Sequence, residues 1–269
     1  MKKIIICILT AGFITNCSVE NPDNMNTDIT QTYFTELMAC KAGPDQSQET
    51  MTNMISEWQQ LLEGDGLVGS WGYAPAVETN STGDTIWWEL QWASQDDANS
   101  AWQAWTQNTD ASAWEEKYSS VLDCDGENRQ SYDVAYPMAS NVFGELPDTG
   151  YFFAEIHICE YNNGASKEDA LAFLSGFNNA VNKGGYEETS YHYGNYFQQG
   201  NEDGFLWGNF TNSKDSMDKA NEAFEANVRS EMFPIFSEFA SCGEVPDLYN
   251  GYTLYWSEDK DFMPTFPSS

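Results

Sequence analysis

Positively charged side chains are scarce in this sequence. Its 269 residues include 11 Lys and Arg against 42 Asp and Glu, a formal net charge of −31. Binding to nucleic acid or to an anionic membrane surface depends on cationic side chains that release counterions. The scarcity argues against nucleic acid as a partner and indicates a chain kept soluble by its charge in a salty medium. A bound cation or basic partner is the alternative.

The sequence also lacks the short motifs of common enzyme classes. It contains no Walker loop, no Rossmann glycine pattern, no serine nucleophile elbow and no HExxH zinc motif. Its two histidines, His157 and His192, could bind a metal or a haem iron together with Glu155, but an ordinary hydrogen-bonded histidine is the simpler interpretation. The acidic residues 123–128 are typical of a turn rather than of a calcium loop. We therefore predict no metal site and no cofactor.

Long apolar runs are absent after the first residues. Residues 4–15 form a short apolar stretch behind Lys2 and Lys3, the pattern of a secretory signal that is too short to span a bilayer. Cys17 lies where a bacterial lipoprotein is cleaved and acylated, although Asn16 departs from the usual small residue. We expect an exported protein, periplasmic or on the outer surface, with Cys17 as the lipidation site and membrane anchor. Plain secretion is the alternative.

Cysteines are few, and their spacing reveals an internal repeat. Cys159 follows Cys40 by 119 residues, and Cys242 follows Cys124 by 118. Apolar positions match across the same interval through the predicted strands and helices, which indicates two copies of one unit. The predicted divisions are a signal peptide (1–16), a flexible tether (17–31), repeat 1 (32–137), a linker (138–150), repeat 2 (151–257) and a C-terminal tail (258–269).

The hydrophobic pattern of each copy predicts the order β-α-β-β-α-β. In the first copy we expect strands at 33–40, 67–74, 85–92 and 130–136, and helices at 47–62, 95–106 and 111–122. In the second copy the first helix should start at Ser166, and Pro234 should break the last one. The predicted fold class is α+β, with two tandem ferredoxin-like domains.

This topology also predicts how the cysteines pair. Strand one runs antiparallel to strand four, so the end of one lies beside the start of the other. Cys40 would then meet Cys124, and Cys159 would meet Cys242, each forming a disulfide. Free or differently paired cysteines are the alternative.

The two helices between strands three and four carry a resemblance to a known family. Residues 91–102 (QWASQDDANSAW) and 210–215 (FTNSKD) are similar to the strand–Ser–helix stretch of the dimeric α/β-barrel superfamily, antibiotic-biosynthesis-monooxygenase type. The resemblance implies that two sheets pack face to face into a pseudo-dimeric α/β barrel, which one chain could close alone. The helical histidine of many members has no match here, since Trp105 and Trp114 stand in that region. The residue set of the haem-degrading branch cannot be mapped.

Alternation along strand one predicts which side chains face the barrel. The more apolar set, expected against the helices, is Leu37, Ala39, Ile156 and Ile158. Glu36, Glu155 and His157 would then face the barrel and are the candidate catalytic residues. Glu36 and Glu155 occupy equivalent positions, where paired carboxylates could share a proton, bind a cation or act as acid and base. Salt bridges or exposure at the rim are the alternative.

Aromatic residues, 15% of the sequence, supply the candidate ligand-binding positions. Those on strands two and three could stack on a flat apolar ligand or a sugar, with core packing as the alternative. The candidate ligand-binding residues are Trp71, Tyr73, Trp88, Tyr191, His192, Tyr193 and Trp207.

These observations favour a non-catalytic envelope protein that binds a small apolar or aromatic ligand, or a protein partner. The first alternative is an enzyme of monooxygenase or isomerase type that uses the Glu and His side chains. The second is a purely structural module with a solid barrel. The same fold hosts many chemistries and does not decide among them.

Overall fold

The structure, a computed structural model, describes residues 30–64, 66–137, 149–186 and 189–267. Cys17, the predicted signal peptide and most of the predicted tether and linker lie outside these residues. The elements of the first half are β1 (Thr30–Ala42), α1 (Gln48–Leu61), β2 (Leu67–Pro75), β3 (Ile86–Trp92), α2 (Gln95–Gln107), α3 (Thr109–Tyr118), β4 (Leu122–Cys124) and β5 (Gln130–Pro137).

The second half repeats this order with one addition, a π-helical segment. Its elements are β6 (Tyr151–Tyr161), α4 (Lys167–Val181), β7 (His192–Gln198), β8 (Gly204–Thr211), α5 (Lys214–Ala223), η2 (Phe224–Val228), α6 (Arg229–Phe239), β9 (Ala240–Cys242) and β10 (Asp247–Trp256). Helix α4 begins after Ser166, whose backbone N–H donates to the Asp169 carboxylate over 2.9 Å, as the capping pattern predicts.

Pro234 does not break the last helix, and that prediction is wrong. It lies inside α6, which continues to Phe239. A proline costs a helix one backbone hydrogen bond. Here Met232 and Phe239 of the same helix are buried against the sheet, so tertiary packing offsets the loss.

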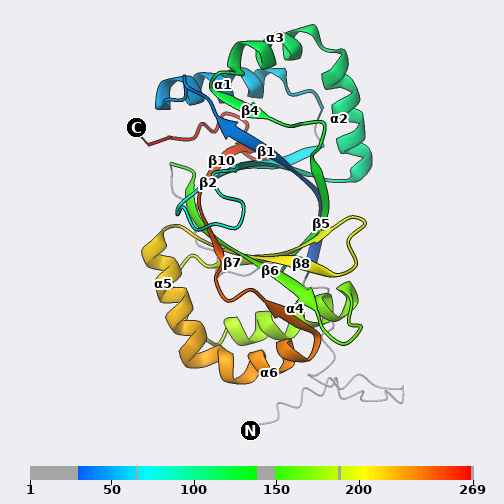
Figure 1. The fold of residues 1–269 in the computed structure, drawn as a ribbon, viewed down its shortest axis with the longest axis vertical. Coiled ribbons are helices and arrows are strands. Elements are labelled where there is room, and N and C mark those ends of the chain that lie inside the picture. Colours follow the sequence, from blue (N-terminus) through cyan, green and yellow to red (C-terminus); the bar gives the residue numbers. More distant parts are fainter. Residues whose placement is uncertain (1–29, 65, 138–148, 187–188, 268–269) are drawn as a thin grey trace, which may run out of the picture.

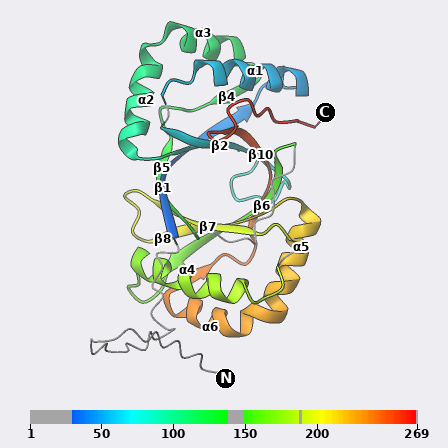
Figure 2. The same ribbon diagram turned by 180° about the vertical axis from the view of Figure 1, so that it is seen from behind.

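The strands form a closed antiparallel barrel within the single chain. Their order is β2-β3-β1-β5 in the first half and β7-β8-β6-β10 in the second. Strand β5 pairs with β7 and β10 pairs with β2, which joins the halves at both edges. Figures 1 and 2 show the resulting ring, with α1, α2 and α3 outside one half and α4, α5 and α6 outside the other. This mixed architecture is consistent with a dimeric α/β-barrel-like fold.

The faces of strand β1 are the reverse of the prediction. Phe34, Met38 and Cys40 pack against the helices, in the same core as Ile55 of α1. Glu36 stands two residues from Phe34 and Met38, so it shares their face and points to the helices too. Glu155 and His157 do the same on β6, where they pair with helix-side positions of β8. The barrel-facing assignment of these three residues is wrong. Near Glu36 both faces of β1 are buried, since Thr35 is as inaccessible as Glu36, so the more apolar set does not identify the helix side.

Two further segments, the β2–β3 connection and the C-terminal tail, pack against the barrel and its first core. The β2–β3 connection is attached to β10, since Asn80 exchanges hydrogen bonds of 2.8 and 2.9 Å with the backbone of Leu248. In Figure 1 this connection extends across the left side of the barrel opening. The described part of the C-terminal tail packs on the first half: Phe266 is buried in its core, and Gln59 Nε2 donates to the Phe262 carbonyl over 3.0 Å.

Both predicted disulfides are present. Cys40 pairs with Cys124 and Cys159 with Cys242, across 84 and 83 residues of sequence. In each half the bridge joins directly opposed residues of neighbouring antiparallel strands. The expected position of strand one beside the segment before strand four is therefore confirmed.

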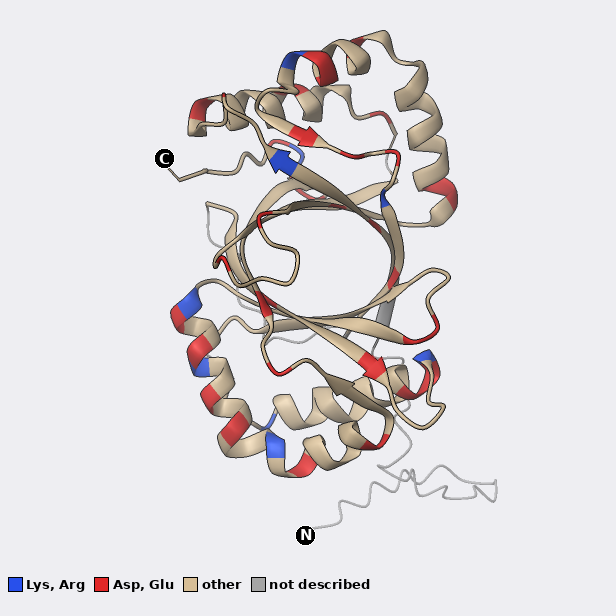
Figure 3. Cartoon of the chain, viewed as in Figure 1, with Lys and Arg blue, Asp and Glu red and all other residues tan. Residues whose placement is uncertain are grey.

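The described part of the chain contains no helix with the length and apolar character that a membrane crossing requires. Figure 3 shows the charged positions spread mainly over the helices, the turns and the strand ends that surround the ring.

Candidate functional site

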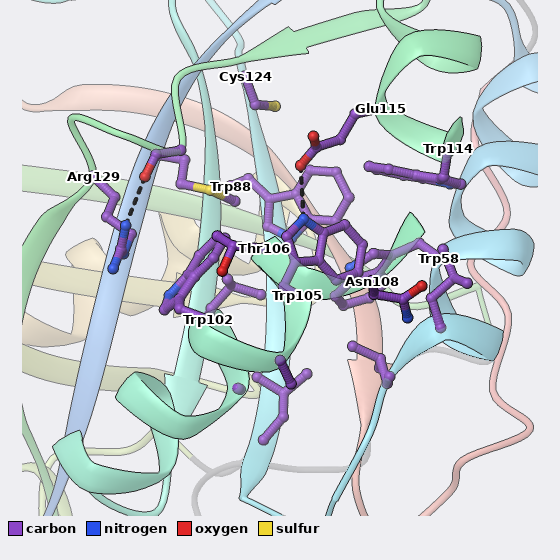
Figure 4. Close-up of a pocket in the computed structure, with 18 of the residues that line it drawn as sticks. Trp58, Trp88, Trp102, Trp105, Thr106, Asn108, Trp114, Glu115, Cys124 and Arg129 are labelled. Carbon is purple, nitrogen blue, oxygen red and sulfur yellow. Dashed lines mark hydrogen bonds between the residues drawn. The ribbon is translucent and has the colours of Figure 1, made fainter. Parts of the chain in front are cut away.

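A cavity of about 490 Å³ lies between the sheet of the first half and its helices. This volume falls in the range of roughly 300–1,000 Å³ that is usual for small-molecule sites. Figure 4 shows how its tryptophan side chains converge from three helices and a strand. The tryptophans that line it are Trp58 of α1, Trp88 and Trp92 of β3, Trp102 and Trp105 of α2, and Trp114 of α3.

Hydrogen bonds and ring contacts hold these tryptophans in place. Trp88 Nε1 donates to Ser70 Oγ over 2.8 Å, and Trp105 Nε1 donates to Glu115 Oε1 over 2.7 Å. The ring of Trp114 makes edge contacts with those of Trp88 and Trp105, at centroid distances of 6.4 and 5.8 Å. These contacts fix the aromatic part of the cavity wall, while Asn108, Glu115 and Arg129 add polar and charged groups to the lining.

A buried ion pair stands at one side of this cavity. Glu36 is 3% exposed and accepts three hydrogen bonds, from Arg129 Nε (2.6 Å), Trp102 Nε1 (2.5 Å) and Trp92 Nε1 (3.0 Å). The Arg129 guanidinium also lies over the Trp102 ring at 4.3 Å and donates to the Gly126 carbonyl. Among the described residues that line the cavity, Arg129 is the cationic one. Its charge is held in one orientation by these contacts.

The turn before β5 positions Arg129. Asn128 N–H donates to Asp125 Oδ1 over 3.0 Å, which makes the turn predicted for residues 123–128. Cys124, at the start of this turn, is tied to β1 by the disulfide. The turn and the bridge together fix the guanidinium against Glu36.

In the second half Glu155 takes the position equivalent to Glu36, but its hydrogen bonds come from an amide instead of a guanidinium. Glu155 is half-buried and accepts hydrogen bonds of 3.1 and 3.3 Å from Asn221 Nδ2, and burial raises the pKa of its carboxyl group. His157, also on the helix side of β6, has its pKa lowered by burial. The core beneath the helices is packed with phenylalanine rings, including Phe173, whose centroid lies 5.3 Å from that of Phe239. The hollow of the first half is here replaced by side chains.

The predicted ligand-binding residues do not assemble into one site. Trp88 lines the cavity. Trp71, Tyr73 and His192 lie on strand positions that face the barrel interior, as the pairing of Trp71 with Glu89 and of His192 with Phe210 indicates. The other three are core residues of the second half: Tyr191, Tyr193 and Trp207. Their rings stack on one another, with 5.7 Å between Tyr193 and Trp207.

The alternative metal site is not assembled either. His157 and His192 lie on opposite faces of the sheet, one toward the helices and one toward the barrel interior. Within the described residues, no group of three or more His, Cys, Asp or Glu side chains is arranged to hold a metal ion.

Sequence reasoning missed Trp102, Glu115 and Arg129 as site residues. The signal for the tryptophans was present, because Trp102 and Trp105 stand three residues apart on a predicted helix and so share one face. Arg129 left no comparable signal. Its role depends on a contact with Glu36, 93 residues away in sequence.

Comparison with solved structures supports the fold. A candidate monooxygenase from Fusobacterium nucleatum matches 90% of this chain and 96% of its own, with 11% identity and a TM-score of 0.51. Another from Lactobacillus acidophilus gives 8% identity, 88% and 98% coverage and a TM-score of 0.48. Chlorite dismutase from Candidatus Nitrospira defluvii gives 12% identity, 85% and 94% coverage and a TM-score of 0.44.

The Fusobacterium nucleatum structure shares the fold of this chain over most of both chains, which agrees with the α/β-barrel resemblance seen in the sequence. No protein-family description and no curated protein matches the sequence.

Proposed function

We propose that this protein is an enzyme of monooxygenase or isomerase type, with its site in the tryptophan-lined cavity of the first half. The observation that supports this most is the combination of an apolar cavity of about 490 Å³ with a single oriented guanidinium, that of Arg129, in its wall. Flat apolar walls and one fixed charge are what a planar substrate with a reactive oxygen requires.

This proposal corrects the interpretation that the sequence favoured. The chain was expected to be a non-catalytic envelope protein that binds a ligand or a protein partner. A structural neighbour that shares its fold over most of both chains is a candidate monooxygenase, which favours the enzyme alternative and makes the non-catalytic interpretation wrong. The proposed catalytic residues also differ from those chosen in the sequence, because Glu36 and His157 do not face the barrel interior.

In the proposed reaction the tryptophans hold the ring and Arg129 stabilises negative charge on its oxygen. An isomerase moves a proton next to a carbonyl group through an enolate. A monooxygenase of this type lets such an anion react with O₂: a methylene carbon loses two hydrogens and gains one oxygen atom, and the second oxygen atom leaves as water. Both reactions pass through an oxyanion, and a preorganised cation lowers its energy.

Glu115 is the proposed proton acceptor. It lines the cavity, and its Oε1 is held in place by Trp105 Nε1. Its other oxygen, Oε2, takes no part in that bond and can receive the substrate proton. Glu36 has a different role, since it touches Arg129 and two indole N–H groups and so positions the guanidinium.

The test uses benzo-fused ketones such as 2-tetralone, which are flat, apolar and carry acidic C–H groups. Deuterium exchange followed by NMR reports the enolate, and an oxygen electrode reports O₂ consumption. We expect exchange above the buffer rate, reduced by about 10²-fold or more in Arg129→Gln, a loss typical of an oxyanion-stabilising group.

Arg229→Gln, which removes an exposed ion pair with Glu225, is the matched control and should leave the rate unchanged. If ketones quench tryptophan fluorescence but no exchange or O₂ uptake exceeds that of buffer, the enzyme proposal fails.

Three features predicted from the sequence stand beside this function as proposals. They are export to the periplasm or outer surface, a lipid anchor on Cys17, and descent of the two halves from tandem ferredoxin-like copies. The equal strand order and the equivalent disulfides of the halves support the last.

A further inference from the structure

A carboxylate lies inside the barrel, away from the cavity described above. Glu89 is 1% exposed and sits on β3 opposite Leu37, on the face that looks into the ring. Its Oε2 accepts a hydrogen bond from the Tyr73 hydroxyl. Its Oε1 makes no hydrogen bond of full geometry among the described residues, although the Tyr196 hydroxyl lies near the carboxyl group and partly offsets the effect of burial on its pKa. One acceptor of a buried carboxylate is therefore unsatisfied, which is unusual in a folded protein.

Two more unpartnered oxygens lie on the same face. Gln91, two residues along β3, is 4% exposed, and Thr35, directly opposite Gln91 on β1, is fully buried. Gln91 Oε1 and Thr35 Oγ1 also lack partners among the described side chains and backbone. Residues i and i+2 of a strand share a face, and opposed residues of antiparallel strands are neighbours. Three unsatisfied oxygens thus gather on one patch of the inner wall.

Among the described residues, no salt bridge brings a cationic side chain to this patch. The ion pairs found among the described residues involve other carboxylates, and none includes Glu89. An ionised carboxylate buried without a partner costs several kcal/mol, so it must hold a proton or a cation.

The other groups that face Glu89 are tyrosines. Tyr73 comes from β2, and Tyr136 and Tyr196, whose hydroxyls are 2.8 Å apart, come from β5 and β7. Burial keeps the pKa of all three hydroxyls well above the ordinary value, so they stay neutral. Burial also raises the pKa of the Glu89 carboxyl to about 7, so near neutral pH a proton and a cation compete for it.

We propose that the barrel interior binds one alkali cation through Glu89 Oε1, Gln91 Oε1 and Thr35 Oγ1. Oxygen ligands suit hard cations, and the patch offers three of them. A single carboxylate balances a single positive charge, which favours Na⁺ or K⁺ over a divalent ion. This site is separate from the proposed enzyme cavity and does not depend on it.

The first experiment measures thermal unfolding at constant ionic strength in KCl, NaCl and choline chloride. Constant ionic strength is needed because any salt screens a net charge of −31. A cation that binds the folded state alone raises Tm with its concentration. We expect Tm to rise as K⁺ or Na⁺ replaces choline, and the ion that gives the larger rise is the preferred one.

Variants separate this site from general screening. Glu89→Gln keeps an oxygen that can accept from Tyr73 but removes the charge, and it should abolish the difference between alkali and choline salts. Thr35→Val removes one ligand without removing charge and should weaken the cation dependence. The matched control is Glu231→Gln, an exposed carboxylate on α6, which should behave as the wild type.

The second experiment locates the ion. Crystals grown in RbCl should show an anomalous peak between the three oxygens, and its absence in the Glu89→Gln variant would support the assignment. The proposal is overturned if Tm is equal in alkali and choline salts, or if the position holds only a water without an anomalous signal. It is also overturned if Glu89→Gln raises Tm equally in every salt, because Glu89 would then hold only a proton.

Discussion

The Glu36–Arg129 pair makes the most direct prediction about the candidate site. Replacing Arg129 with Met removes the guanidinium while keeping much of the side-chain stem. Glu36 would then remain buried with two indole N–H donors, from Trp92 and Trp102, and no positive charge beside it. Breaking a buried ion pair by removing one partner costs about 3–5 kcal/mol. The upper part of that range applies to full burial of both partners, and the Arg129 side chain is 27% exposed.

We therefore expect Arg129→Met to destabilise the protein by about 3 kcal/mol. Glu36→Gln should cost a similar amount, because its amide N–H₂ would face the indole and guanidinium donors. The double variant Glu36→Gln with Arg129→Met should lose less than the sum of the two single variants, since no unpaired charge remains.

Urea unfolding followed by far-UV circular dichroism measures these free energies without relying on the fluorescence of the tryptophans involved. An exposed pair of the same kind, Arg229 with Glu225, supplies the control, and Arg229→Met should cost less than about 1 kcal/mol. If Arg129→Met costs no more than this control, or if the two changes are additive, the pair does not hold the site together and the positioning role of Glu36 is refuted.

Three further predictions concern the rest of the molecule. Replacing Cys40 and Cys124 together with Ala opens a loop of 84 residues and should cost about 4–5 kcal/mol, read from urea midpoints under oxidising conditions; an unchanged midpoint would show that the bridge does not form. The pKa of Glu89 is raised to about 7 from an ordinary 4.5, so the folded state binds a proton on Glu89 more tightly than the unfolded state does. This proton stabilises the folded state fully below about pH 4.5, and the stabilisation is lost as pH rises through about 7. In choline buffer the stability of Glu89→Gln relative to wild type should therefore rise by up to about 3 kcal/mol from pH 4.5 to 7.5, and a flat difference would contradict the assignment. Phe177→Ala should cost about 3–5 kcal/mol by emptying the packed core of the second half, and a cost below 1 kcal/mol would show that this half is not solid.

Local sequence signals predicted the elements well because local physics sets them. Ser47 and Thr50 form a capping box at the start of α1, so the helix begins where the pattern placed it. The spacing of Cys40 and Cys124 led to the correct bridge because antiparallel pairing of two strands puts those residues opposite each other. Helix α6 shows the limit of local rules, since the packing of its apolar residues outweighs the effect of Pro234.

The candidate site was only partly predictable. Glu36 and Trp88 were among the candidate residues and lie beside or in the cavity wall, but the face assigned to Glu36 was wrong, since both sides of its strand are buried there. The contact of Glu36 with Arg129 joins positions 93 residues apart, and no periodicity in either segment encodes it. The same holds for the cavity, which depends on how far α2 and α3 stand from the sheet.

By itself, the sequence determined the order of strands and helices, the pairing of the cysteines and the acidic character of the chain. The order of elements follows from hydrophobic period and capping residues, which act over short distances along the chain, and the cysteine pairing follows from the strand arrangement that this order implies. Tertiary structure decided which face of each strand meets the helices and where Glu89 is buried. It also decided that the first half has a cavity in the region where the second half is packed with phenylalanine side chains. Those outcomes depend on side chains from distant segments that compete for the same volume, and only the folded arrangement settles that competition.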